Sequence, residues 1–414
     1  MSRLAELIEE LCPDGVEYRP LGEIADLQRG SGMPKKLFVD EGIPAIHYGH
    51  IFMKYGIHTK CAAAYLAPED ADKLTRVYPG DLVVANTSEN LEDVGKGVVW
   101  LGEAEGVTGG HATVVRSKTV DSVFLSYFLR TEDFALKKRK YSQGTKVVEL
   151  SAANLSKIHI PVPPLVVQRE IVRILDQFTT LEAELEAELE ARRAQYEHYR
   201  NHLLSYESLS SRGPVEMVKL GDIASIQRGR RFTLDQLGGA GCPAIHYGQI
   251  YTHYGVSTTS VLSYIEESFS SSLRFAFPGD IIVAGVGETV EDVGIGVAWL
   301  GTDAVAYHDD SFALHHDQDP RYLSYWLRSD EYHRQKRSFV SQGKVKRLSA
   351  KGLAAVKMPL PDLSEQRRIA DLLDRFDALV NDITSGLPAE IAARRAQYEH
   401  YRDRLLSFPE KKAE

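Results

Sequence analysis

The chain has 414 residues, 43% hydrophobic and 26% charged, which is enough for two or more domains with ordinary cores. The net charge of −9 argues on average against a nucleic-acid partner, but the local distribution of charge decides binding. No run of 18 apolar residues suggests a membrane span, and the N-terminal MSRLAELIEELCPDG predicts a short amphipathic helix rather than a signal peptide. The widely separated Cys12, Cys61 and Cys242 are expected to be reduced thiols of a cytoplasmic protein.

The second half of the chain repeats the first at a nearly constant separation. LGEIADLQRG at Leu21 matches LGDIASIQRG at Leu220, and PAIHYGHI at Pro44 matches PAIHYGQI at Pro243, both 199 residues later. SYFLR at Ser126 recurs as SYWLR after 198 residues, and ARRAQYEHYR recurs verbatim after 202. A period near 200 indicates a duplicated pair of domains and not a solenoid of short repeats.

Each copy begins with a globular stretch of mixed α and β character. DLVVA, GVVWL, DIIVA and GVAWL predict strands, whereas SVFLSYFLRTEDFALKKRK and PRYLSYWLRSDEYHRQKR have helical spacing. The PGD tripeptides at Pro79 and Pro278 are interpreted as turns that lead into strands and not as nuclease motifs. The segments IPVPPL at Ile160 and MPLPDL at Met358 predict strand-like exits, because helix does not continue through such prolines.

A long helix follows each globular stretch. Apolar residues spaced by three and four, from Val166 to about Ser205 and again in the second copy, predict two helices that pack together as a coiled coil. Gly386 and Pro388 are expected to break the second helix, with Pro388 in the first turn of the restarted helix. The predicted interface stripes consist of Ile171, Ile174, Phe178, Leu181 and Leu185 in the first helix and Ile369, Leu372, Phe376, Leu379 and Ile383 in the second.

The sequence lacks the common catalytic patterns. There is no GxxxxGK[ST] phosphate loop, no NPPY or DPPY tetrapeptide, no HExxH and no Cys/His cluster. His315-His316 and His308-Asp309-Asp310 are expected to be ordinary surface or core residues and not metal ligands. The sequence therefore predicts neither a catalytic residue nor a metal site.

Basic residues gather at equivalent places of the two copies. KKRKYSQGTK begins at Lys137 and RQKRSFVSQGKVKR at Arg334, while QRG at Gln28 matches QRGRR at Gln227. One such run is usually a solvated face, but two equivalent runs favour nucleic acid, since cations neutralise phosphates and amides read base edges. The HYG stretches add candidates, although strand and turn packing explains them equally well. The polar loops NTSENLEDVG and GVGETVEDVG are further candidates, because loops held by rigid strands often carry recognition. The predicted DNA-binding residues are Arg29, Tyr48, His50, Tyr55, Asn90, Lys137, Lys138, Arg139, Lys140, Gln143 and Lys146, and Arg228, Arg230, Arg231, Tyr247, Gln249, Thr252, His253, Tyr254, Arg334, Lys336, Arg337, Gln342, Lys344, Lys346 and Arg347.

The helical segments carry a family resemblance over essentially the whole chain. QREIVRILDQFTTLEAELEAELEARRAQYEHYRNHLLSY and QRRIADLLDRFDALVNDITSGLPAEIAARRAQYEHYRDRLLSF resemble the specificity subunit of type I restriction-modification systems. The resemblance implies two target recognition domains that each read one half of a bipartite DNA site. It also implies two modification subunits, which bind S-adenosylmethionine and methylate adenine, and translocating restriction subunits as partners. This chain would then bind no cofactor and catalyse nothing, and LEAELEAELEAR would set the spacing between the half-sites.

The expected fold is α+β, with two similar recognition domains separated by two long antiparallel helices in a pseudo-twofold repeat. The expected segments are residues 1–165, 166–206, 207–363 and 364–408, alternating between domain and helix, with a tail at 409–414. VTGGHATVVRS is aligned with VAYHDDSFALH, so the half-sites are expected to be related but not identical.

Two other functions stay open. One is a single-chain restriction or modification enzyme, which needs an active site that the sequence does not reveal. The other is a coiled-coil scaffold without DNA affinity, which the paired basic runs disfavour.

Overall fold

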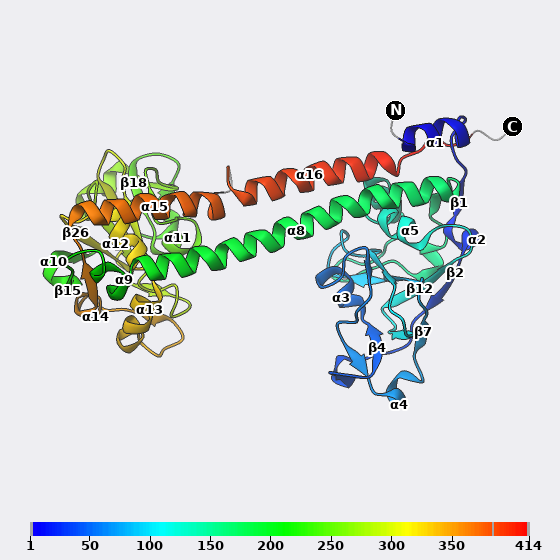
Figure 1. Cartoon of the computed structure of the whole chain (residues 1–414), viewed down its shortest axis with the longest axis horizontal. Helices are drawn as coiled ribbons and strands as arrows, with labels where there is room; N and C mark the ends of the chain where they lie inside the picture. The colour runs from blue at the N-terminus through cyan, green and yellow to red at the C-terminus, as the bar shows by residue number, and fades with distance from the viewer. Residues whose placement is uncertain (1–2, 383–384, 412–414) are drawn as a thin grey trace. The chain divides into compact units, whose positions relative to one another are not determined.

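The computed structural model describes residues 3–382 and 385–411. The chain forms two compact units, unit 1 with residues 1–186 and 391–414 and unit 2 with residues 187–390. The long helix α8 (Leu165–Leu203) contributes its first part to unit 1 and its second part to unit 2 (Figure 1). The predicted helical segments are therefore not domains of their own. Among the described residues, no helix has the length and apolarity needed to cross a bilayer.

Unit 1 contains a globular part with two five-stranded sheets. The first has the strand order β2-β12-β8-β10-β5 and the second β3-β6-β4-β11-β7, and two-stranded sheets pair β1 with β14 and β9 with β13. Both large sheets are mixed, because β5 runs parallel to β10 and β4 parallel to β11 while the other pairs are antiparallel. The elements are α1 (Arg3–Leu11), β1 (Tyr18–Pro20), α2 (Leu21–Ile24), β2 (Ala25–Arg29), η1 (Lys35–Leu37), β3 (Phe38–Val39), β4 (Ile43–Ile46), α3 (Tyr48–Met53), β5 (His58–Thr59), β6 (Tyr65–Leu66), α4 (Pro68–Ala71), β7 (Thr75–Val77), β8 (Leu82–Ala85), β9 (Thr87–Ser88), β10 (Gly97–Trp100), β11 (Gly106–Thr108), β12 (Ala112–Ser117), α5 (Ser122–Phe128), α6 (Glu132–Arg139), β13 (Val148–Glu149), α7 (Ala152–Leu155) and β14 (His159–Pro161).

Unit 2 repeats this topology strand for strand. Its large sheets have the orders β16-β26-β22-β24-β19 and β17-β20-β18-β25-β21, and β15 pairs with β28 and β23 with β27. The duplication predicted from the sequence is thus a duplication of the fold. The elements are α9 (Tyr206–Ser210), β15 (Glu216–Lys219), α10 (Leu220–Ile223), β16 (Ala224–Arg228), η2 (Leu234–Gln236), β17 (Leu237–Gly238), β18 (Cys242–Ile245), α11 (Tyr247–Thr252), β19 (Ser257–Thr258), β20 (Ser263–Ile265), η3 (Glu267–Ser272), β21 (Phe275–Ala276), β22 (Ile281–Ala284), β23 (Val286–Gly287), β24 (Gly296–Trp299), β25 (Val305–Tyr307), β26 (Ser311–His316), α12 (Pro320–Trp326), α13 (Asp330–Lys336), η4 (Arg337–Phe339), β27 (Lys346–Arg347), α14 (Ala350–Ala355), β28 (Lys357–Leu360), α15 (Leu363–Asn381) and α16 (Leu387–Leu405).

Apolar runs in the central strands are buried on both faces. In β8, Leu82 and Val84 belong to a core shared with α5 and α8, whereas Val83 and Ala85 belong to a second core under α3. Because alternate side chains point to opposite faces, a strand covered on both sides is apolar throughout. Strand β4 and helix α4 lie at the end of unit 1 farthest from α8 (Figure 1).

Each unit contains a helix segment from the other half of the chain. In unit 1, Phe178 of α8 stacks on Tyr401 of α16, with ring centroids 5.6 Å apart, and Glu182 pairs with Arg395. The later residue of α8 thus contacts the earlier residue of α16, so the two helices are antiparallel here, as predicted. In unit 2, the Tyr199 ring of α8 stacks at 5.7 Å on Phe376 of α15. The verbatim ARRAQYEHYR segments therefore each serve the unit encoded in the other half of the chain.

The interface stripe is only partly as predicted. Ile171 and Ile369 are buried in the domain cores, and Phe178 and Phe376 make the helix contacts, but Leu181 and Leu379 are 52% and 45% exposed. A continuous seam is thus wrong at these two leucines, because the helices turn one face to their own domain and another to the partner helix. The half-buried residues of the stripe are Ile174, Leu185 and Leu372, and Ile383 lies outside the described residues.

The second helix breaks where expected, and the predicted tail is not a tail. Helix α15 ends at Asn381, and α16 restarts at Leu387 with Pro388 in its first turn. Glu410 forms a parallel bridge with Val16, which accepts and donates backbone hydrogen bonds of 2.9 Å with the C-terminal segment. Residues 409–411 therefore belong to unit 1, because they continue its backbone pairing.

Candidate nucleic-acid interface

Two lysines of the basic runs are structural. Lys138 of α6 is 3% exposed, and its Nζ donates to the carbonyl oxygens of Glu92 and Val94 at 2.9 and 2.7 Å. Lys336 of α13 is fully buried and makes the same two bonds, of 2.9 and 2.6 Å, to the carbonyls of residues 291 and 293. Burial lowers the pKa of Lys138 to about 8 and that of Lys336 to about 7. Neither ammonium group can reach a phosphate, so the DNA-binding prediction is wrong for these two lysines.

The remaining cations of the first run divide into bound and exposed groups. Lys137 is half-buried, with Nζ 2.8 Å from Asp133 and 4.7 Å from the ring centroid of Tyr18. Arg139 and Lys140 follow at the exposed end of α6. Only the end of the run and the loop after it are therefore available to a polyanion.

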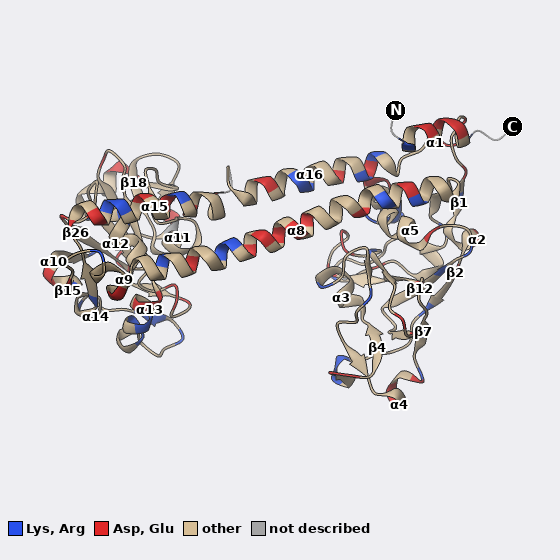
Figure 2. Cartoon of the chain, viewed as in Figure 1, with Lys and Arg blue, Asp and Glu red and all other residues tan. Residues whose placement is uncertain are grey.

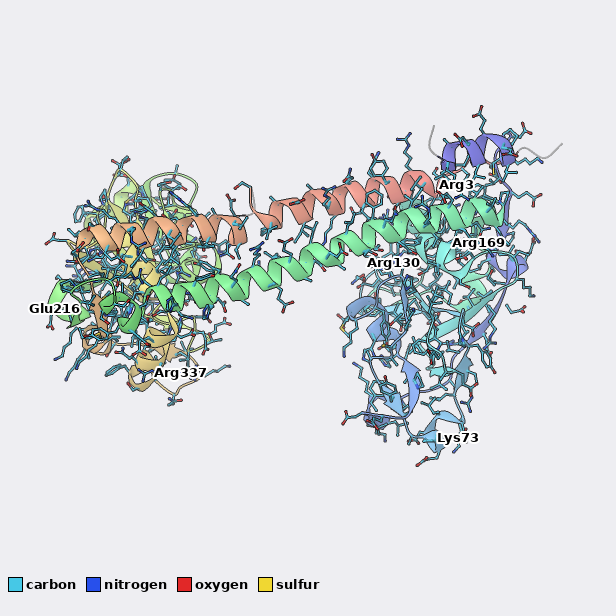
Figure 3. All side chains as sticks on the ribbon, viewed as in Figure 1. Arg3, Lys73, Arg130, Arg169, Glu216 and Arg337 are labelled. Carbon is cyan, nitrogen blue, oxygen red and sulfur yellow. The ribbon has the colours of Figure 1, made fainter. Side chains whose placement is uncertain are left out.

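The second run behaves in the same way. Arg334 is held by Glu331 at 2.7 Å, and Arg337 lies at the end of α13, where Figure 3 labels it. Figure 2 shows Lys and Arg gathered at α13 and in the loop that follows it. The exposed candidates in the loops after α6 and α13 are Gln143, Lys146, Gln342 and Lys344, whereas Arg230 and Arg231 lie in the loop after β16 and the half-buried Lys346 lies in β27.

An arginine stands at the same strand end in both units. Arg29 ends β2 and donates from Nε to the Gly110 carbonyl at 3.2 Å, and Arg228 ends β16 and donates to the Asp309 carbonyl at 2.6 Å. The glycine of QRG permits this approach, since a Cβ at Gly30 would lie 2.1 Å from the Gly109 carbonyl oxygen. Both guanidinium groups are thus positioned by backbone while more than half of each side chain is exposed.

In unit 1 this arginine joins a short β-ladder to a loop. Arg29 lies 3.4 Å from the carboxylate of Glu149, whose strand β13 pairs with β9. The hydroxyl of Thr87 in β9 lies 3.1 Å from Nδ1 of His111, and the rings of His111 and Tyr48 are 5.0 Å apart. The resulting surface combines a cation, an anion, a hydroxyl–imidazole pair and an aromatic ring.

In unit 2 the equivalent surface lines a groove of about 590 Å³. Asp310 lies 3.1 Å from Arg347 and 3.8 Å from Arg228, and both arginines line the groove with Val286 of β23. Tyr247, the counterpart of Tyr48, lies 5.3 Å from the ring of His308. Here two arginines share one carboxylate.

The HYG stretches build helix caps beside these surfaces. Nδ1 of His47 accepts from the Gly49 amide at 3.1 Å, and Nδ1 of His246 accepts from the Gly248 amide at 3.3 Å. Burial lowers the pKa of both histidines to about 4, with a further lowering by the nearby His50 and Lys35 for His47 and by His308 for His246. Both are neutral at physiological pH, as an accepting cap requires.

Several predicted contact residues have structural roles instead. The Tyr55 hydroxyl accepts from the Ala63 amide at 2.7 Å, and that of Tyr254 accepts from the Leu262 amide at 2.9 Å. His50 is buried. A base-reading role is therefore wrong for the buried His50, whereas Tyr55 and Tyr254 are half-buried and their hydroxyls accept backbone bonds.

Polar caps also occupy two amide side chains. Gln249 accepts from the His246 amide at 3.1 Å and donates to Ser263 at 2.7 Å. Asn90 is exposed, but its amide group donates to Asp93 at 2.9 Å. Both amides hold local structure.

Thr252 and His253 lie elsewhere in unit 2. Both are exposed and line a pocket with Asp374 and Asn381 of α15, whereas neither lines the groove of Arg228. The structure thus brings them together with Tyr254 and not with the arginines of that groove.

The PGD turns lead into strands as predicted. The Asp81 carboxylate accepts from the Tyr78 amide at 2.9 Å and lies 3.1 Å from Arg116, and Asp280 accepts from the Phe277 amide at 2.6 Å. Both aspartates are buried with their hydrogen bonds satisfied by the turn, which explains them without a nuclease role.

The sequence reasoning missed Thr87, His111, Glu149 and Asp310. The duplication carried the signal, but VTGGHATVVRS was aligned one residue out of register. Val107 pairs with Ala45 in unit 1 and Ala306 pairs with Ala244 in unit 2, which fixes an offset of 199 between the copies. His111 and Asp310 are therefore equivalent positions of the two units. A β-strand shifted by one residue exchanges its two faces, so the shift hid the comparison.

The sequence model of one protein family, the type I restriction modification DNA specificity domain, matches residues 13–191 and 213–393. The chain belongs to this family. Each matched range covers one globular copy and much of the helix after it, so the DNA specificity domain occurs twice in this chain.

Relatives with the same family name match most of the chain. A relative from Haemophilus influenzae, described as a type I restriction enzyme specificity subunit, is 28% identical over 95% of this chain and 96% of its own length. The specificity subunit of a type I restriction enzyme of Escherichia coli is 33% identical over 62% of this chain and 65% of its own length.

Solved structures support the fold of the DNA specificity domains. A chain from a type I restriction-modification system aligns with a TM-score of 0.66 and 17% identity over 95% of this chain and 98% of that chain. The HsdS subunit from Thermoanaerobacter tengcongensis aligns with a TM-score of 0.50 and 17% identity over 96% of each chain. The two family matches and the relatives make the chain a type I specificity subunit with two recognition domains, and the solved structures agree with its fold.

Proposed function

We propose that each unit reads one half of a bipartite double-stranded DNA site through the surface around Arg29 in unit 1 and Arg228 in unit 2. One observation carries the proposal: both units present an exposed arginine, fixed by backbone at the same strand end, on a DNA specificity domain. A positioned guanidinium can donate two hydrogen bonds to one base edge, which is the commonest specific contact in the major groove.

The loops after α6 and α13 supply affinity in this proposal. Arg139, Lys140 and Lys146 are exposed in unit 1, and Arg337 and Lys344 are exposed in unit 2. Contacts from flexible cations to phosphates give strength without sequence information and weaken with added salt. The overall charge of −9 does not oppose this, since the cations lie together in the loops.

The methyl transfer and DNA cleavage belong to partner chains in this proposal. Two modification subunits carrying S-adenosylmethionine would dock on the helical segments, one for each copy of the repeat, and restriction subunits would join them. The duplication supports this stoichiometry because it supplies each docking surface twice. The complex would act in the cytoplasm, where S-adenosylmethionine and the DNA of a prokaryotic cell are found.

No second function is proposed for the acid–histidine group in unit 2. His308, Asp309 and Asp310 have ligand atoms within 4.8 Å of one another, the one such set found among the described residues. Asp310 is paired with Arg347 at 3.1 Å, so a cation would have to displace an arginine.

The test combines Arg29→Ala with Arg228→Ala in the complex with a modification subunit. Binding to a duplex that carries the motif methylated by the wild-type complex should fall to the level of binding to a random-sequence duplex. The salt dependence of binding to the random-sequence duplex should stay unchanged. Arg19→Ala is the matched control, because Arg19 is also exposed and pairs with Glu23 at 3.4 Å. Motif binding that survives the double substitution would contradict the proposal. In parallel, this chain alone should transfer no methyl group from S-adenosylmethionine to DNA.

A further inference from the structure

The two reading surfaces share one arginine and differ in what surrounds it. Arg29 and Arg228 occupy equivalent strand ends and bond to equivalent carbonyls, those of Gly110 and Asp309. Their side chains are 54% and 57% exposed. Differences between what the units read must therefore come from neighbouring positions.

The partner carboxylate comes from different segments in the two units. In unit 1 it is Glu149, which lies opposite Thr87 in the β9–β13 ladder. In unit 2 the ladder position belongs to Arg347, opposite Val286, and the carboxylate is Asp310 on the neighbouring loop. The ladder position thus holds an acid in unit 1 and a base in unit 2, and unit 2 has an acid where unit 1 has a histidine.

The exchange changes the hydrogen-bonding groups offered to a ligand. Unit 1 offers the donors of Arg29 beside the acceptor oxygens of Glu149. Unit 2 offers two guanidinium groups, because Arg347 uses Nη1 for Asp310, and Arg228 uses Nε for a backbone carbonyl. Val286 replaces Thr87 and adds an apolar wall to the groove of about 590 Å³.

These ion pairs add little to stability. The partners Arg347 and Arg228 are each 57% exposed, and ion pairs at that exposure are weak because water and salt screen them. A purely structural brace would also not need its sign reversed between two copies of one fold. The geometry fits recognition better than bracing.

We propose that residues 149 and 347, together with 111 and 310, are specificity determinants of the two half-sites. Arg347, oriented by Asp310, donates to the O6 and N7 acceptors of a guanine in the half-site of unit 2. Glu149 accepts from an exocyclic amino group of cytosine or adenine in the half-site of unit 1. The pairing follows from the base edges, since guanine presents two acceptors in the major groove, whereas cytosine and adenine present an amino donor. The inference rests on the proposed function, because it names which bases that reading surface distinguishes.

The test transplants the chemistry of unit 2 into unit 1. Glu149→Arg with His111→Asp reproduces, around Arg29, the set formed by Arg228, Asp310 and Arg347. Methylated adenines are mapped in cells that express the modification subunit with this variant. One position of the first half-site should change its preferred base to guanine, by a factor of about ten or more. The second half-site and the spacer should not change.

The matched control is Glu23→Arg. Glu23 is an exposed carboxylate of the same unit, 3.4 Å from Arg19, so the substitution also reverses charge beside an arginine. It should leave both half-sites unchanged. An active transplant variant with both half-sites unchanged overturns the inference.

A variant without activity does not end the test. Arg347→Lys keeps the charge and the pairing with Asp310 but removes bidentate geometry, so the purified complex should lose about ten-fold discrimination at one base of the second half-site. Unchanged discrimination overturns the inference. Failure of the proposed function is distinguishable, because the variant with both Arg29→Ala and Arg228→Ala would then still bind the motif.

Discussion

Inserting one more LEAE unit after Glu188 should move the half-sites apart and leave their sequences unchanged. Helix α8 passes from unit 1 to unit 2 between Glu186 and Ala187, inside the repeat. The contacts of Glu182 and Phe178 lie before the insertion, and that of Tyr199 lies after it. Neither reading surface is altered.

The size of the effect follows from helix geometry. Four residues add ~6 Å along the axis and rotate the rest of the helix by ~40° beyond a full turn. Since B-DNA rises ~3.4 Å per base pair, the spacer should lengthen by one or two base pairs. The chain passes between the units a second time between Glu390 and Ile391, so a matched insertion after Glu390 should restore full activity if the single insertion weakens it.

The assay is the methylome of cells that carry the insertion with the modification subunit. Glu184→Ala is the control, because this exposed substitution leaves the helix length unchanged and should leave the spacer unchanged. An active insertion variant with the original spacer would refute the reasoning, because the repeat would then not hold the readers apart.

Three further sets of substitutions test the contribution of the exposed cations to DNA affinity, the burial of Lys336 and the packing of the long helices. Replacing Arg139, Lys140 and Lys146 with alanine should weaken binding to all duplexes and reduce by about 3 the slope of the logarithm of the binding constant against the logarithm of salt concentration. Titrations at several salt concentrations measure this slope. An unchanged slope would show that these residues do not contact DNA. Because burial lowers the pKa of Lys336 to about 7 from 10.5, the unfolded chain binds more protons between these values, and the free energy of unfolding rises with pH across that window. Urea unfolding of Lys336→Met should lack this rise, and an equal rise in both proteins would contradict the buried charge. Phe178→Ala should lower the free energy of unfolding by about 1–3 kcal/mol, whereas Leu181→Ala should lower it by less than about 0.5 kcal/mol. Equal losses would indicate that Leu181 packs in the helix interface as Phe178 does.

The sequence by itself determined the duplication, the strands and the broken helix. Repeated segments keep their offsets whatever the fold, and apolar runs such as DLVVA become strands covered on both faces. Pro388 and Gly386 act through their own backbone conformations, so the break between α15 and α16 needed no tertiary information. These features depend on residues close together along the chain.

Only the tertiary structure decided which charges are available. Lys138 and Lys336 stand four residues after Phe134 and Tyr332, on the same helix face, and that face is buried. The sequence contained this spacing but not which face of the helix meets the core. Burial depends on residues far away in the chain, such as the carbonyls that bind these ammonium groups.

Tertiary structure also decided how the helices and the reading surfaces are assembled. The two ARRAQYEHYR segments are identical, so sequence alone could not assign each one to the unit encoded in the other half of the chain. Strand register pairs Glu149 with Thr87 in unit 1 and Arg347 with Val286 in unit 2, and it makes His111 and Asp310 equivalent positions of the two units. The ion pairs of Glu149 with Arg29 and of Arg347 with Asp310 join residues more than 30 positions apart. Such pairings depend on strand register and chain path, which local residue patterns leave undetermined.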